Sequence, residues 1–224
     1  MENLKTTAIV LRRTNFGEAD RILALLTPEG KLSVMAKGVR KEKSKLAGGI
    51  ELFSVSDVVI HRGKGDLGVL TSVRLKDFYK EIMKDLEAME FMGGVLKDVA
   101  RRTEQVDDPE FFALVEQVLA GVDESLRRKG DLDVARAWWG INVARVSGEE
   151  MNLRFDVSGE KLAAEKRYGW DALEGAFRES AGGEIGAEQI KLMRLMASSP
   201  LKLVMRVAGV NDLAGEIWQV VKRF

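Results

Sequence analysis

The sequence predicts an α+β, multidomain protein in which a small five-stranded β-barrel precedes an all-α helical domain with a small irregular lobe inserted in it. Two observations support this fold class. Apolar residues recur with a period of two as far as about Phe78, and with the helical period of 3.6 beyond it. A segment this short cannot make two well-filled sheets, and closing a single sheet removes its exposed edges.

Five runs of alternating apolar residues are predicted to be strands: residues 7–12, 21–26, 31–37, about Ile50 to His61, and 67–75. The turn at residues 27–30 has Pro and Gly where a type I turn prefers them, which makes the third run a hairpin partner of the second. Leu32, Val34 and Ala36 should then face inward. At this size the oligonucleotide-binding (OB) fold is the commonest barrel, with an SH3-like barrel as the alternative.

Beyond the barrel, one apolar stripe predicts a long helix: Tyr79, Ile82, Met83, Leu86, Met89 and Leu96. Asp108 and Pro109 supply an N-cap and a first turn for a second helix, which Gly130 ends. A third helix is predicted over about 132–146, and Gly148 is placed to stop it.

Glycines and charges interrupt the apolar residues of the segment 149–186, which is predicted to form the lobe. A helical pattern resumes at Ala187 with two breaks, so three short helices should follow. We therefore expect a barrel domain over residues 1–79, a helical domain over 80–148 and 187–224, and the lobe between those two helical parts.

The side-chain inventory restricts the possible chemistry. The chain has no cysteine and one histidine, so disulfides, thiolate catalysis and Cys/His zinc sites are excluded. His61 ends an apolar alternating run, where a barrel-end histidine is the simpler interpretation than a catalytic one. The glycines of residues 63–68 match a dinucleotide-binding spacing, but they lead into a strand, and this favours a hairpin loop. We predict no catalytic residue, cofactor or metal. Metal-dependent chemistry by carboxylates is the one alternative that the inventory leaves open, and an activity assay with magnesium would test it.

The charge is unevenly distributed along a chain whose net charge is zero. Residues 1–80 carry 15 Lys and Arg against 9 Asp and Glu, so the first part is basic and the remainder is acidic. The segment 37–45 holds five cations and one carboxylate: Lys37, Arg40, Lys41, Lys43 and Lys45 with Glu42. Such a loop attracts phosphates and releases their counterions, which predicts binding of a single-stranded nucleic acid. The alternative is a solvated surface loop.

Further cations on or beside the predicted strands complete the candidate nucleic-acid surface: Arg12, Arg13, Lys31, Arg62, Lys64 and Arg74. Aromatic residues are few in this part of the chain. Only Phe16, Phe53 and Phe78 occur in the first 78 residues, and Phe53 is expected to be buried. We therefore expect base stacking to contribute little and backbone charge to dominate.

Four blocks in the barrel segment resemble a known family. They are residues 6–11, 17–23, 27–32 and 36–40, and Leu52-Phe53-Ser54 after the basic loop also fits. In order and spacing they are similar to the N-terminal domain of the bacterial RecO recombination mediators. The resemblance is specific over about the first 80 residues and architectural beyond them.

The resemblance implies an OB-fold barrel that binds single-stranded DNA, anneals complementary strands and helps load the recombinase RecA onto strands coated by single-stranded-DNA-binding protein. It implies RecR as a partner and a docking site for the acidic tail of single-stranded-DNA-binding protein on the helical body. Candidate cations for that tail are Arg101, Arg102, Arg127 and Arg128. Many members bind zinc through two Cys-x-x-Cys pairs, but this sequence has none, so packing of residues such as Phe155, Trp170 and Phe177 should hold the lobe, which is otherwise partly mobile.

Two other functions stay open at this point. An RNA-binding or ribosome-associated OB-fold adaptor would carry the same charge, and an enzyme with a pocket between barrel and body is disfavoured by the inventory. The sequence has no run of about 18 apolar residues and no signal peptide, so we expect a cytoplasmic, nucleoid-associated protein that does not contact membrane.

Overall fold

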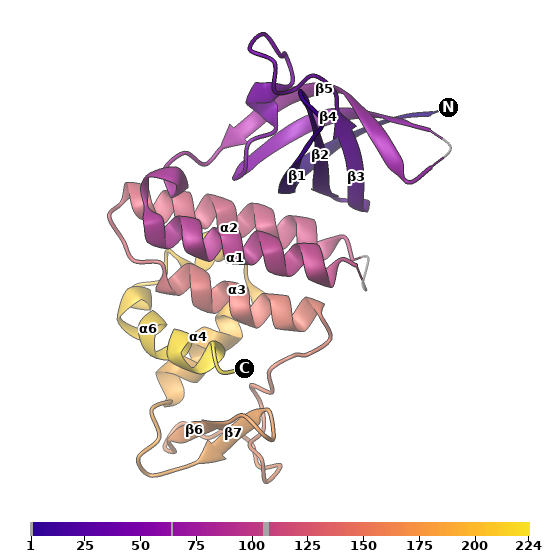
Figure 1. Ribbon diagram of the computed structural model, residues 1–224. Helices are drawn as coiled ribbons and strands as arrows, with labels where there is room; N and C mark the ends of the chain where they lie inside the picture. The colour runs from indigo at the N-terminus through magenta and orange to yellow at the C-terminus, as the bar shows by residue number, and fades with distance from the viewer. Residues whose placement is uncertain (1, 64, 105–107) are drawn as a thin grey trace. The chain divides into compact units, whose positions relative to one another are not determined.

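The computed structural model describes residues 2–63, 65–104 and 108–224 (Figure 1). The chain forms two compact units, residues 1–123 and 124–224. Among the described residues, no helix is long and apolar enough to cross a membrane.

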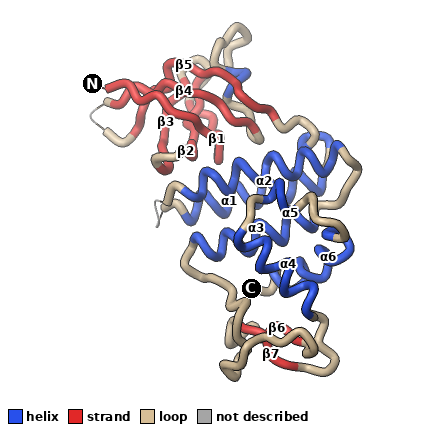
Figure 2. The backbone as a smooth tube through the Cα atoms, turned by 180° about the vertical axis from the view of Figure 1, so that it is seen from behind, coloured by secondary structure: helices blue, strands red, loops and turns tan. Residues whose placement is uncertain are grey.

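A closed five-stranded barrel forms the first part of the chain, as predicted (Figure 2). Its strands are β1 (Glu2–Phe16), β2 (Asp20–Thr27), β3 (Gly30–Ala36), β4 (Ser54–Arg62) and β5 (Leu67–Phe78). The order around the barrel is β1-β2-β3-β5-β4, in which β3 and β5 run parallel and the other neighbours are antiparallel. This is an OB-fold barrel, and the fold-class prediction is confirmed.

Strand β1 takes part in both halves of the barrel. Its first half pairs with β4, from Glu2 opposite Arg62 to Ile9 opposite Val55, and its second half pairs with β2. The change of partner is at Ile9, which pairs with both strands, and a bulge follows it between Val10 and Arg12. Such an extra residue bends a strand and increases its twist. The barrel core includes the predicted inward residues Val34 and Ala36, both fully buried, with Leu32 packed against them.

The fourth strand begins later than its apolar pattern predicts, at Ser54 instead of Ile50. Residues 47–49 form a 3-10 turn, η1, and Phe53 has a φ of 61°, a left-handed conformation that interrupts extended backbone. The Ser56 hydroxyl donates to the Gly49 carbonyl at 2.8 Å, and a Cβ on Gly49 would lie 1.7 Å from the Val73 side chain. The turn therefore packs closely against β4 and β5, and this is why the strand starts only at Ser54.

The first helix is also shorter than predicted. A 3-10 turn, η2 (Ile82–Lys84), precedes α1 (Leu86–Arg102). The Asp85 carboxylate accepts a hydrogen bond from the Ala88 N–H at 2.8 Å, which is an N-cap that starts the helix at Leu86. Met83 and Leu86 are 48% and 68% exposed, so the predicted stripe is wrong at these two positions, while Ile82 and Leu96 are buried as expected.

The remaining helices follow the predicted pattern. They are α2 (Glu110–Arg127), α3 (Asp133–Val146), α4 (Ala187–Ser198), α5 (Leu201–Val204) and α6 (Val210–Val221). The Glu110 N–H donates to the Asp108 carboxylate at 2.8 Å, so Asp108 helps to satisfy the first turn of α2. In α3, Trp138 is buried and its indole N–H donates to the Ser199 carbonyl at 2.9 Å. This bond fixes the break between α4 and α5 against α3.

The lobe contains a two-stranded sheet, β6 (Tyr168–Asp171) and β7 (Ala176–Glu179). Phe177 is fully buried and meets Tyr168 and Trp170 edge-on, with ring centroids 6.4 and 5.2 Å away. Phe224 packs edge-on against Trp170 at 5.3 Å. Phe155, which was expected to help hold the lobe, is 38% exposed, whereas its neighbour Leu153 is buried.

An acidic side chain organises the loop of residues 156–160 in the lobe. The Asp156 carboxylate accepts from the Ser158 hydroxyl at 2.6 Å and from the N–H groups of Ser158 and Glu160 at 2.9 and 3.1 Å. These bonds, the Ser158 hydroxyl foremost, lower the pKa of Asp156. A hydrogen-bonded Asp turn therefore closes this loop.

Candidate nucleic-acid interface

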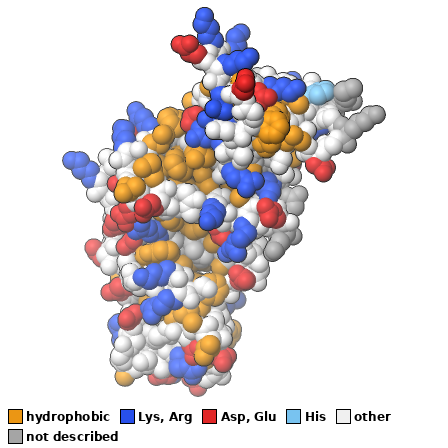
Figure 3. Space-filling view, viewed as in Figure 1, with side chains coloured by type: hydrophobic (Ala, Val, Ile, Leu, Met, Phe, Trp, Pro, Cys, Tyr) orange, Lys and Arg blue, Asp and Glu red, His pale blue; other side chains and the backbone are white. Residues whose placement is uncertain are grey.

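The basic loop, residues 37–45, leaves the barrel directly after β3 and forms the projection at the top of Figure 3. Its five cations are all exposed: Lys37, Arg40, Lys41, Lys43 and Lys45. Within the described parts of the chain, none of the five forms an ion pair with a carboxylate. Their charges are therefore available to an external anion.

The base of the basic loop is fixed to the turn between β1 and β2. The Gly38 N–H donates to the Asp20 carboxylate at 2.6 Å, and Gly38 has a φ of 63°. The Arg40 N–H donates to the Ala19 carbonyl at 2.9 Å, and its guanidinium donates to the Gly17 carbonyl at 3.2 Å. These bonds hold the first part of the loop in one position relative to the barrel.

The middle of the basic loop folds back on itself. The Lys41 N–H donates to the Gly38 carbonyl at 3.1 Å, and the Ser44 N–H donates to the Lys41 carbonyl at 3.0 Å. Val39 is buried in the barrel core between these exposed cations. The loop is thus a series of turns with a buried apolar anchor, and this arrangement keeps its cations on the outside.

The other predicted cations on the barrel have different surroundings. Arg12 is exposed, whereas the Arg13 guanidinium lies 2.6 Å from the Glu51 carboxylate. Arg74 is exposed and pairs with Asp57 on the neighbouring strand at 2.7 Å, which lowers the pKa of Asp57. Each of these two guanidinium groups is therefore partly neutralised by its own carboxylate, which weakens its attraction for a phosphate.

Lys31 is used within the protein. Its ammonium donates to the Ala100 carbonyl at 2.9 Å and lies 3.3 Å from the Glu104 carboxylate. Ala100 belongs to the last turn of α1, where unpaired carbonyls and the helix dipole favour a cation. Its position on β3 therefore places Lys31 against a helix end.

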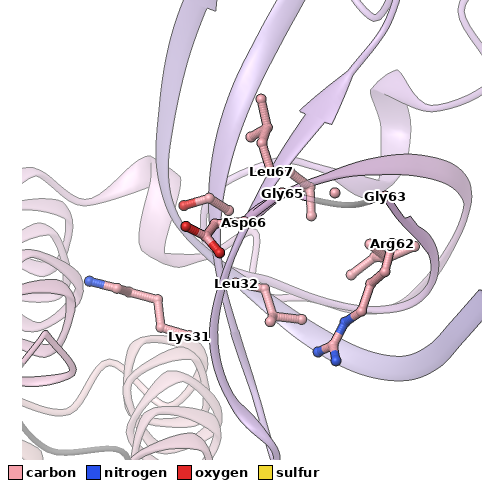
Figure 4. A pocket seen from close by; sticks show the side chains of 11 residues that line it. Lys31, Leu32, Arg62, Gly63, Gly65, Asp66 and Leu67 are labelled. Atoms are coloured by element: carbon pink, nitrogen blue, oxygen red, sulfur yellow. The ribbon is translucent and has the colours of Figure 1, made fainter. Parts of the chain in front are cut away.

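A pocket of about 510 Å³ lies beside the β4–β5 hairpin, where β3 and β5 run parallel (Figure 4). Arg62 and Asp66 contribute one charge of each sign to its lining, and the ammonium of Lys31 points away from it. Arg62 is exposed, and Lys64 lies outside the described residues. The ring of His61 is 3.0 Å from the Asn3 side chain, which gives this histidine a barrel partner.

The candidate cations on the helices are all engaged in some contact. Arg101 and Arg102 share the Asp98 carboxylate at 2.8 and 2.7 Å, and Arg128 pairs with Glu124 on its own helix. Arg127 also has a partner in the protein. In the described residues, no group of three or more His, Cys, Asp or Glu side chains is placed to hold a metal ion.

Comparison with known proteins identifies the family. Residues 1–79 match the model of the N-terminal domain of recombination protein O. The chain is 30% identical over 223 residues to the DNA repair protein RecO of Dehalococcoides mccartyi, and the match covers 96% of this chain and 86% of the relative. The chain belongs to the RecO family. Its role is in DNA repair and recombination.

Other RecO proteins match shorter parts of the chain. The DNA repair protein RecO of Synechococcus elongatus is 40% identical over 122 residues, which is 53% of this chain and 45% of the relative. That of a Roseiflexus species is 41% identical over 83 residues, or 37% of this chain and 29% of the relative. The family prediction is confirmed.

Two residues beside the basic loop were not predicted as part of the surface of this RecO family member. Arg21 lies opposite Ala36, one residue before the loop, and its guanidinium is bonded to the Asn15 side chain at 3.1 Å. Phe16 ends β1 and is 52% exposed. The alternation of apolar residues does not identify either residue as part of this surface, because only the β1–β2 turn places them beside the loop.

Proposed function

We propose that this RecO family member binds single-stranded DNA through its basic loop, anneals complementary strands and helps load recombinase onto strands coated by single-stranded-DNA-binding protein. The observation that carries the proposal is the set of five exposed loop cations without carboxylate partners in the described residues, on a loop anchored to the barrel. We assign the nucleic-acid-binding role to residues 1–79.

Annealing by such a surface needs no bond chemistry. Two complementary strands repel each other through their phosphates, and cations that neutralise both backbones lower that repulsion. Arg12 and Arg62 are further exposed cations on the barrel. Arg13 and Arg74 contribute less, since each already neutralises a carboxylate. We therefore propose a mediator that acts without catalytic residues.

A salt titration tests the binding step. Anisotropy of a labelled oligonucleotide should give an affinity whose log–log salt slope is about −3.5, since about five phosphate contacts each contribute about −0.7 for a single strand. Unlabelled DNA of the same length should compete at least as well as RNA. Absence of binding at low salt would contradict the proposal, and a preference for RNA would favour an RNA adaptor.

We propose that the helical domain, residues 80–148 and 187–224, binds the protein partners, among them RecR and the acidic tail of single-stranded-DNA-binding protein. Arg101 and Arg102 both contact the Asp98 carboxylate, so two guanidinium groups lie close together near the end of α1. Paired guanidinium groups are the donors that bind carboxylates most strongly, and an acidic peptide supplies such carboxylates. Arg127 and Arg128 are further candidates.

A labelled peptide with an acidic, apolar C-terminal sequence tests the partner site. Replacing Arg101 and Arg102 together with Ala should weaken peptide binding about tenfold in fluorescence anisotropy. The matched control is Lys97→Ala, because Lys97 is an exposed cation on the same helix. Equal loss in both variants, or none in the first, would place the tail elsewhere.

A further inference from the structure

We propose that Phe16 is a stacking platform for one unpaired base, placed beside the phosphate-binding loop. This inference rests on the proposed binding of single-stranded DNA and adds a contact to the bases. Phe16 is the last residue of β1, and its side chain is 52% exposed. The barrel core therefore uses less than half of a large aromatic surface that proteins usually bury.

The register of the barrel sets the position of this ring. Phe16 lies directly opposite Asp20 on β2, and residues directly opposite on neighbouring strands project from the same face of the sheet. The Asp20 carboxylate accepts from the Gly38 N–H at 2.6 Å. The ring thus lies on the face from which the basic loop starts.

A second set of bonds fixes the distance between ring and loop. The Gly17 carbonyl, next to Phe16 in sequence, accepts from the Arg40 guanidinium at 3.2 Å, and the Ala19 carbonyl accepts from the Arg40 N–H at 2.9 Å. Because the β1–β2 turn and the loop are joined at three points, a strand held by the loop cations passes the ring at a fixed distance.

The combination of an exposed aromatic ring and exposed cations favours single-stranded DNA as the ligand. Exposed cations bind the phosphates of a strand, and an exposed aromatic ring has a face for a base, which stacks regardless of its identity because every base has a π-face. The bases of a duplex are already stacked and paired, so the ring selects unpaired bases. The bases nearest the loop should therefore be held in place, in addition to the backbone.

Two carboxylates also lie near the ring. Asp20 accepts a hydrogen bond from the Gly38 N–H, and Glu18 is exposed at the tip of the turn. Both keep their negative charge, so the attraction of a strand to this site comes from the cations of the basic loop. A second exposed aromatic, Phe78, lies at the end of β5 and pairs with Ser54, away from these anchors. Phe78 therefore serves as a control with similar exposure.

The test compares two oligonucleotides of equal length and charge, one of thymidines and one with an abasic backbone. Affinities for both are measured by anisotropy at one salt concentration for the intact protein and for Phe16→Ala, Phe16→Trp and Phe78→Ala, each with a melting curve to verify folding. We expect the intact protein to prefer the thymidine strand about tenfold, Phe16→Ala to lose that preference, and Phe16→Trp to keep it. Phe78→Ala should behave like the intact protein.

The outcomes separate the two proposals. If the intact protein binds with a steep salt dependence but Phe16→Ala changes nothing, or weakens both oligonucleotides equally, the stacking role is wrong and the phosphate-binding role stands. If Phe78→Ala loses the base preference as well, the assignment to Phe16 is wrong. Failure of the intact protein to bind either oligonucleotide would overturn both the proposed function and this inference.

Discussion

Replacing Lys41, Lys43 and Lys45 together with Glu is expected to weaken single-strand binding more than about 100-fold at 0.1 M salt. All three ammonium groups are exposed and have no carboxylate partner among the described residues, so they are the cations most available to phosphates. Each lost phosphate contact changes the log–log salt slope by about 0.7, so the loss of three contacts lowers the affinity about 100-fold at 0.1 M salt. The new carboxylates add repulsion.

The salt slope distinguishes this effect from unfolding. It should flatten from about −3.5 to about −1.4, and strand annealing should slow in parallel. The corresponding Gln variant, which removes charge without reversing it, should show the same slope with a smaller loss. A matched control carries Glu at Lys97, Lys191 and Lys202, three exposed lysines on the helices. If the control lost as much affinity, net charge and not the loop would govern binding.

The second large effect concerns the lobe, where Gly183→Ala should destabilise the packing around Tyr168 by about 2–3 kcal/mol. A Cβ on Gly183 would lie 2.4 Å from the carbonyl carbon of Tyr168 and 2.6 Å from its nitrogen. The obstacle is backbone, so no side chain can move aside. The same stretch bridges to Ile185, whose N–H and carbonyl both bond to Tyr168.

Gly182 gives an unusually close control for that experiment. It is the preceding residue, it is exposed, and nothing lies within 4 Å of a Cβ at this position. Gly182→Ala should change the free energy of unfolding by less than about 0.5 kcal/mol. Chemical denaturation followed by tryptophan fluorescence compares the two variants. Equal stability would show that the lobe is loose enough to absorb the added methyl group.

The alternating pattern predicted the barrel because it depends on local geometry. Of the predicted inward residues of β3, Val34 and Ala36 lie in the core and Leu32 packs against it. The pattern failed where a non-local contact or a helix cap determines the residue at which an element begins. Ile50 continues an apolar run, but residues 47–49 form a 3-10 turn in which Gly49 lies so close to the Val73 side chain that a Cβ would not fit. Likewise, the stripe through Met83 is helical in period, yet the Asp85 cap starts the helix after it.

The candidate site was predictable in part for the same reason. Charge density along the sequence identified the basic loop, since those cations are neighbours in the chain. It also included Lys31, whose ammonium bonds to a helix carbonyl 69 residues away, a contact that no local pattern contains. Phe16 was omitted because its proximity to the loop depends on the Asp20 and Arg40 hydrogen bonds.

The division of β1 between two partners also sets the order in which the barrel can be completed during synthesis. The second half of β1 can pair with β2 as soon as β2 has been synthesised. The first half can pair only after β4 has emerged from the ribosome, about fifty residues later. Until then the nascent chain carries an unpaired strand edge, the kind of edge that joins other chains. A translational pause before Ser54 would therefore prolong the stage in which this edge is unpaired and open to other chains.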